Sequence, residues 1–153
     1  MRRPDLPAVF VDADVLIAGS ASTGGASHLI LQLGELGLID VVSSDQARRK
    51  AERNIARKLP EASGTFDRLI RSACRWVPDP SEEELAGHTD EADEEDLPIL
   101  VAAAAAGCPI LVTFNVRDFH PRSIDVTVET PAAFVERLRG RLRGLVRPET
   151  DQP

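Results

Sequence analysis

Asp12 and Asp14 interrupt an otherwise apolar run, residues 9–19 (VFVDADVLIAG), which has the composition of a buried strand leading into a turn. A buried carboxylate without a partner is strongly unfavourable, so a merely structural role explains the pair poorly. Residues two apart on a strand face the same way, so both carboxylates converge if the strand continues that far. This arrangement favours a cation site, with Asp12 as an ion ligand.

Other candidate ligands stand where elements should begin or end. Asp96 opens an Ala-rich helical pattern, and Asn115 and Asp118 follow an apolar strand pattern. Glu52 lies beside the apolar stripe of an amphipathic helix. Asp93 is a rival for the place of Asp96, because the stretch DEEDLP supplies several acids at one helix start. The rest of residues 90–95 is expected to be a solvated face.

Gathered carboxylates repel one another, and without a counter-charge one or more of them would take up a proton. A hard divalent cation removes this repulsion; Mg²⁺ takes oxygen ligands at about 2.1 Å, usually a few carboxylates and water. Such an ion activates a water molecule and stabilises the leaving oxygen of a phosphodiester, and two ions about 4 Å apart do so together. The expected chemistry is therefore metal-assisted hydrolysis.

The elements that would gather these residues alternate between strand-like and helix-like patterns. Strands are expected at the start and within residues 38–44, 74–77, 109–114 and 124–128. Helices are expected within residues 27–36, 44–59, 64–74, 81–88, 96–107 and 130–142, and residues 19–27 (GSASTGGAS) are expected to form a loop. Parallel neighbours need crossover connections, so the pattern predicts an α/β fold: three layers, α/β/α, with a central, mainly parallel sheet. Residues 1–146 are expected to form a single domain, followed by a frayed tail, residues 147–153.

Composition limits the function classes. The chain has 153 residues, 42% of them hydrophobic, and a formal net charge of −7. That balance argues against a protein that coats DNA, because non-specific affinity requires a basic surface. No apolar segment is long enough to cross a bilayer, and the basic start is too interrupted for a signal peptide. Cys74 and Cys108 have no redox or metal spacing, so we expect reduced thiols in a cytoplasmic protein.

The blocks VDADVLIAG and DLPILVAAAAAGCPILVTFNVRDF together resemble the PIN domain family. The first resembles the family's opening motif, and the second resembles its third and fourth motifs: an Asp opening an Ala-rich helix, a Gly-ended crossover, then a strand closing in Val-Thr. The resemblance implies a ribonuclease that depends on Mg²⁺ or Mn²⁺, most often the VapC-like toxin of a toxin–antitoxin pair. It also implies an RNA substrate, a possible cognate antitoxin protein and a homodimer.

By position, the resemblance implies that Asp12, Glu52 and Asp96 are the first three metal-binding acids. Asn115 occupies the place where many members have a fourth Asp, and Asp118 follows closely. Asp14 occupies a place where Asn or Ser is common in the family, and it would orient neighbouring groups or extend the cluster. The candidate catalytic set is Asp12, Glu52, Asp96, Asn115 and Asp118, and the candidate metal ligands are these residues and Asp14.

Other functions are compatible with these residues. Asn115 is neutral, which motivates a PIN fold that binds RNA or a partner without cutting it. A third possibility is a nuclease held silent by its antitoxin. Phosphoryl-aspartate chemistry fits poorly, because such enzymes need a late lysine and this chain has lysines only at Lys50 and Lys58.

Overall fold

The computed structural model describes residues 5–146 and contains one five-stranded sheet in which every pair of neighbours is parallel. The strands are β1 (Ala8–Val11), β2 (Asp40–Ser44), β3 (Cys74–Val77), β4 (Ile110–Val112) and β5 (Thr127–Glu129). Their spatial order is β3-β2-β1-β4-β5. The predicted α/β class and parallel sheet are thus confirmed.

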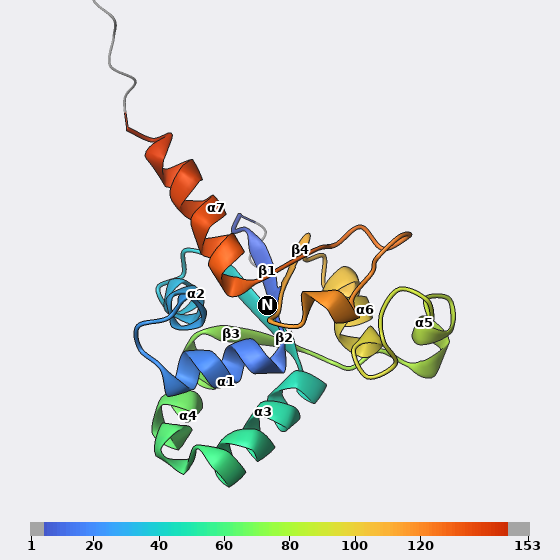
Figure 1. Cartoon of the computed structure of the whole chain (residues 1–153), viewed down its shortest axis with the longest axis horizontal. Helices are drawn as coiled ribbons and strands as arrows, with labels where there is room; N and C mark the ends of the chain where they lie inside the picture. Colours follow the sequence, from blue (N-terminus) through green and yellow to red (C-terminus); the bar gives the residue numbers. More distant parts are fainter. Residues whose placement is uncertain (1–4, 147–153) are drawn as a thin grey trace, which may run out of the picture.

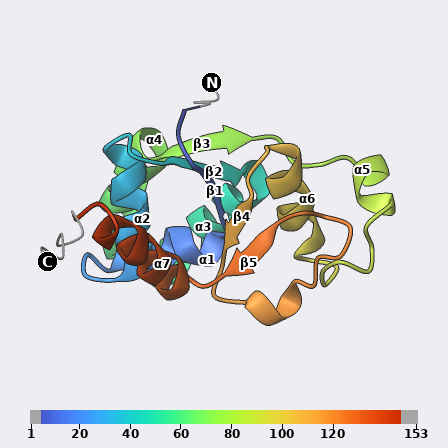
Figure 2. The same ribbon diagram turned by 90° about the horizontal axis from the view of Figure 1, so that it is seen from above.

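Helices cover both faces of this sheet, as Figures 1 and 2 show. Seen from above in Figure 2, α5 and α6 lie on one side of the sheet, and α1, α2 and α7 lie on the other. The elements are α1 (Ala13–Ala21), α2 (Ala26–Glu35), α3 (Asp45–Lys58), α4 (Ser63–Ser72), α5 (Glu82–Ala86), α6 (Leu97–Ala105) and α7 (Pro131–Arg143), with the short 3-10 segments η1 (Pro60–Ala62) and η2 (Val116–Asp118). The central strand β1 is covered on both faces, so Val9, Phe10 and Val11 are fully buried.

The first helix corrects the sequence prediction. Residues 13–19 were expected to continue a strand into a turn, but α1 begins at Ala13 with Asp12 as its N-cap, and residues 19–21 belong to this helix instead of the expected loop. The helix packs against α2, α3 and α4, so much of its surface is apolar and it has no clear polar face. An apolar run of this kind cannot be assigned to strand or helix by periodicity alone.

Two other helices begin and end as their local signals predict. Ser44 caps α3, and its hydroxyl accepts a hydrogen bond from the Ala47 N–H at 3.3 Å. Pro98 lies in the first turn of α6, where its missing N–H has no cost. Gly107 follows the end of α6 with φ 74°, a left-handed conformation that favours glycine.

Strand order determines where a ligand can bind. From β1 the chain builds outward to β2 and β3, then crosses β1 to form β4 and β5 on the other side. The order therefore reverses between β1 and β4, and ligands of open parallel sheets bind at the carboxyl ends of the strands beside such a reversal.

Two further expectations concern the whole chain. No helix within residues 5–146 is long and apolar enough to span a membrane. The expected frayed tail, residues 147–153, lies outside the described residues.

Candidate metal centre

Two chain segments meet at the carboxyl ends of β1 and β4. Asp12 and Asp14 stand where β1 passes into α1, and Thr113 and Asn115 follow β4 directly. The two strands are adjacent and paired through Val11 and Val112, so the segments after them lie side by side. Residues about a hundred positions apart are therefore joined in one hydrogen-bonded group.

Asp12 is buried, with 5% of its surface exposed. Its Oδ1 accepts the Ala13 N–H at 2.7 Å, which caps α1, and its Oδ2 accepts the Thr113 hydroxyl at 3.0 Å. The same hydroxyl lies 3.2 Å from Asp14 Oδ2, so its single proton is shared between two carboxylates. Thr113 thus fixes the relative position of the two acids.

Asp14 is half-buried, and its two oxygens have different surroundings. Oδ2 accepts the Phe114 N–H at 2.9 Å and the Asn115 amide N–H at 3.3 Å. Oδ1 is buried and has no hydrogen-bond partner among the described residues. A buried carboxylate oxygen without a donor is costly, and a cation would satisfy it.

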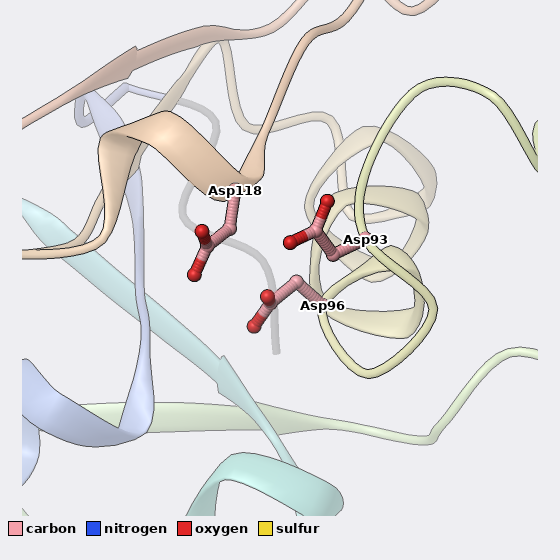
Figure 3. Close-up of side chains that lie close together, drawn as sticks. All are labelled: Asp93, Asp96 and Asp118. Carbon is pink, nitrogen blue, oxygen red and sulfur yellow. The ribbon is translucent and has the colours of Figure 1, made fainter.

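Asp93, Asp96 and Asp118 form a second acidic group, shown in Figure 3. Each offers one carboxylate oxygen, and these three atoms all lie within 4.8 Å of one another. Asp96 is the N-cap of α6, Asp93 lies just before the turn that leads into this helix, and Asp118 comes from η2 after β4. Asp93, the rival for the place of Asp96, therefore joins it instead of replacing it.

The charges of the two groups act on one another. Burial raises the pKa of Asp12, and the charge of Asp118 adds to this effect. The hydrogen bonds from Ala13 and Thr113 act in the opposite direction. Burial, with the charge of Asp12, raises the pKa of Asp14 to about 6. Burial and the charges of Asp12 and Asp118 raise the pKa of Asp96 to about 6. Desolvation and the proximity of like charges thus disfavour the ionised form of these three carboxyls, and a bound cation would favour it.

Glu52 is the expected acid that no described contact brings into the cluster, and its side chain is exposed on α3. The residue of α3 whose charge acts on Asp12 and Asp96 is Lys50, which lowers the pKa of both. Residues two apart on a helix do not face the same way, so a helix that turns Lys50 toward the cluster turns Glu52 away. The sequence placed Glu52 beside the buried stripe but could not say which flank of the stripe faces the site.

Glu91 is a buried carboxylate that the sequence did not single out, since residues 90–95 were expected to be solvated. It is 2% exposed. Its Oε1 accepts three consecutive backbone N–H groups, from Arg122 at 2.7 Å, Ser123 at 2.6 Å and Ile124 at 2.9 Å. Its Oε2 accepts the Ser123 hydroxyl at 2.8 Å and lies 2.6 Å from His88 Nδ1. Burial opposes its charge, but these hydrogen bonds outweigh that effect and hold the pKa of Glu91 well below its usual value.

Glu91 also lies on the segment that positions the second acidic group. Its carbonyl accepts the His120 N–H at 2.8 Å, and the Asp93 N–H donates to the Asp118 carbonyl at 2.9 Å. Ala92 and Phe119 pair between these two contacts in an antiparallel bridge. The loop after β4 and the approach to α6 are thus tied together, which brings Asp93 and Asp118 close.

The donor set suits a hard divalent cation. All the candidate ligands offer carboxylate or amide oxygen, which Mg²⁺ and Mn²⁺ prefer, and the cluster contains no thiol or imidazole ligand among its named members. The orphaned Asp14 Oδ1 and the close oxygens of Asp93, Asp96 and Asp118 are the observations that fit an ion.

The fold resembles a solved structure, that of VapBC2 from Rickettsia felis bound to a DNA fragment from their promoter. The TM-score is 0.58 at 14% sequence identity, and the match covers 80% of this chain and 98% of that chain. At this identity the likeness concerns the fold. A search of curated protein sequences finds no match.

A family model described as the PIN domain matches residues 8–117, which include the two sheet-edge segments and the start of α6. This match spans well over half of the chain. The protein belongs to the PIN domain family.

Proposed function

We propose that this protein is a divalent-metal-dependent ribonuclease and the toxin of a toxin–antitoxin pair. The observation that carries the proposal is the convergence of Asp93, Asp96 and Asp118 within 4.8 Å at the edge of the sheet where Asp12 also lies. PIN domains are generally nucleases, so membership of the family supports the class of reaction.

The proposed ligands of the cation are Asp12, Asp96 and Asp118, with Asp14 and Asp93 completing the acidic surface. Bound there, Mg²⁺ or Mn²⁺ would supply Lewis-acid stabilisation and a more acidic water. Thr113 holds the Asp12 carboxylate through its hydroxyl, and Asn115 holds Asp14 through its amide. Neither Asn115 nor Glu52 is needed as a ligand in this scheme.

Lys50 would contribute the positive charge that a phosphodiester requires beside an acidic cluster. Within residues 5–146 no ion pair occupies its amine, although its charge lowers the pKa of Asp12 and Asp96. We propose in-line attack by water without a covalent intermediate, because the residues named in the cluster include no serine or cysteine and Lys50 is assigned an electrostatic role.

The proposed partners follow from the family. The solved relative is a VapBC complex, and we propose that a cognate antitoxin binds this chain as well. A homodimer and a cytoplasmic location are further parts of the proposal. Comparing cleavage in Mg²⁺ with cleavage in Mn²⁺ identifies which ion the protein uses.

The test is cleavage of a panel of tRNA, rRNA and single-stranded RNA in Mg²⁺, in Mn²⁺ and with chelator. Wild type is compared with Asp12→Asn, which keeps the shape of the side chain, and with Asp125→Asn, a control at an exposed position between η2 and β5. We expect metal-dependent cutting that falls about a hundred-fold or more in Asp12→Asn and is unchanged in Asp125→Asn. Full activity of Asp12→Asn would remove the proposed site.

A second candidate is a PIN fold that binds RNA without cutting it. Two observations favour it: Asn115 is neutral, and Lys50, not an acid, is the α3 residue whose charge acts on the cluster. Folded, antitoxin-free protein that binds RNA but neither cuts it nor binds Mn²⁺ would establish this alternative.

A further inference from the structure

Phe114 is an exposed aromatic residue beside the carboxylate cluster. We propose that its ring stacks on an unpaired base of the RNA next to the cleaved phosphodiester. This inference rests on the proposed function, since it assigns a substrate-binding residue to the same site.

The exposure of Phe114 is unusual within this chain. All six aromatic residues lie within residues 5–146. Four are buried and one is half-buried: Phe10, Phe66, Phe119, Phe134 and Trp76. The Trp76 ring already has partners, because its Nε1 donates to the Ile70 carbonyl at 2.8 Å and the Arg48 guanidinium lies 5.5 Å from its centroid. Phe114, by contrast, is 52% exposed.

The backbone at Phe114 is held by the cluster itself. Its N–H donates to Asp14 Oδ2 at 2.9 Å. On either side, the Thr113 N–H donates to the Glu129 carbonyl at 3.0 Å and the Asn115 N–H donates to the Thr113 hydroxyl at 3.1 Å. The backbone that carries the ring is therefore fixed next to the two residues that hold Asp12 and Asp14. A backbone that is already ordered loses less conformational freedom when a base binds.

The charge of the site explains why an uncharged contact is useful there. The chain has a net charge of −7, and the cluster is acidic, so general attraction of phosphates is weak. Stacking on a π-face adds affinity without requiring positive charge and accepts any base. It also requires a base that is not already paired and stacked, so a duplex is a poor ligand.

The surroundings of Phe114 favour RNA over a protein partner. Its neighbour Asn115 is polar and exposed, and Arg117 is exposed three residues later. The other exposed large apolar side chains are aliphatic and lie on or after α2 and at the end of α7: Leu29, Leu36, Leu38, Leu142, Leu145 and Val146. Phe114 thus belongs to a mixed polar surface, as expected where a base stacks beside bound phosphates.

The experiment measures RNA binding separately from cutting. The probe is a single-stranded RNA of about a dozen nucleotides that carries 2-aminopurine, whose fluorescence changes on stacking. Binding in Mg²⁺ is compared in the non-cleaving Asp12→Asn background for Phe114, Phe114→Ala, Phe114→Leu and Phe114→Tyr. Leu38→Ala is the matched control, because Leu38 is 56% exposed and lies just before the amino end of β2, at the opposite edge of the sheet.

We expect Kd to rise about ten-fold, equal to about 1.4 kcal/mol, in Phe114→Ala and Phe114→Leu. Phe114→Tyr and Leu38→Ala should remain near the parent value, and the same RNA annealed to its complement should bind weakly. In the cleaving background, Phe114→Ala should raise KM with little change in kcat, because the contact is made equally before and during reaction.

The two proposals fail separately. Ring-dependent binding by a chain that cannot cut RNA would support the stacking site and overturn only the ribonuclease. Equal Kd for Phe114→Ala and Leu38→Ala, or equal affinity for duplex and single strand, would overturn the stacking site whether or not the protein cuts RNA. Unchanged RNA affinity with loss of binding to a partner protein would identify the ring as a protein contact and overturn the proposal.

Discussion

Asp14→Asn should stabilise the metal-free protein. The substitution keeps the size of the side chain and an oxygen that can accept the Phe114 N–H, which lies 2.9 Å from Asp14 Oδ2. It removes a charge that burial and the neighbouring Asp12 disfavour. The expected gain in the free energy of unfolding comes from the lost repulsion and desolvation, not from any new contact.

The magnitude follows from the proton affinity of Asp14. Its pKa rises from 3.8 to about 6, which is about two powers of ten and corresponds to about 3 kcal/mol for ionising it in the folded state. Partial hydration of this half-buried site reduces that figure. The new amide also takes the place of one oxygen, and an unpaired N–H where Oδ1 lies would cost about 1 kcal/mol. The net gain is about 1–2 kcal/mol, or roughly 3–6 °C in Tm.

The pH dependence has a definite sign. A folded-state pKa above the unfolded value means that the folded protein holds the proton more tightly. Protonated Asp14 therefore contributes fully to the stability of the folded protein below about pH 3.8, and this contribution is lost as the pH rises towards about 6. The advantage of Asp14→Asn should thus be absent near pH 4, grow between about pH 4 and 6, and stay constant above that.

The assay is thermal unfolding followed by circular dichroism, with chelator, across this pH range. Asp67→Asn, at an exposed position of α4, serves as the control for removing one negative charge from an acidic chain. Titration with Mg²⁺ should stabilise wild type more than Asp14→Asn, because a bound ion uses the carboxylate. Loss of stability in Asp14→Asn at pH 8 with chelator, or an equal gain at pH 4 and pH 8, would refute the reasoning.

Two further predictions concern charges that the structure places in or behind the cluster. Glu91→Gln should lower the free energy of unfolding by about 2–4 kcal/mol at neutral pH in urea melts, because three backbone N–H groups lose a charged acceptor. The folded pKa of Glu91 lies below its unfolded value, so this contribution is present above about pH 4.5 and should vanish as the pH falls further; a loss independent of pH would contradict it. Lys50→Gln should tighten Mn²⁺ binding a few-fold in calorimetry, because it removes a cation that competes for Asp12 and Asp96. Lys58→Gln at the end of the same helix is the control, and weaker Mn²⁺ binding by Lys50→Gln would count against a position near the cluster.

Local signals in the sequence were sufficient to predict the architecture. Alternating strand and helix patterns predicted a parallel sheet with crossover helices, and Ser44, Pro98 and Gly107 marked the ends of α3 and α6. Aspartates after β1 and at the start of α6 were expected at one sheet edge, because parallel strands end together there. These features depend on neighbouring residues, so they can be predicted without knowledge of the fold.

Other features depend on which elements pack together. The phase of α3 decides that the charge of Lys50 acts on Asp12 and Asp96. Residues 13–21 pack against α2, α3 and α4 as a helix, although their apolar run does not by itself distinguish a helix from a strand. Glu91 finds its donors more than thirty residues later in the chain, at Arg122, Ser123 and Ile124.

Composition and local pattern alone therefore determined the fold class, most helix ends and the acids Asp12 and Asp96 as candidates. Only the tertiary structure decided the partners of those acids, the burial of Glu91 and the exposure of Phe114, which the apolar stretch PILVTF had placed in a strand. The physical reason is that capping and periodicity are short-range properties of the backbone. Burial and charge proximity, by contrast, arise from contacts between segments that the sequence separates and the sheet brings together.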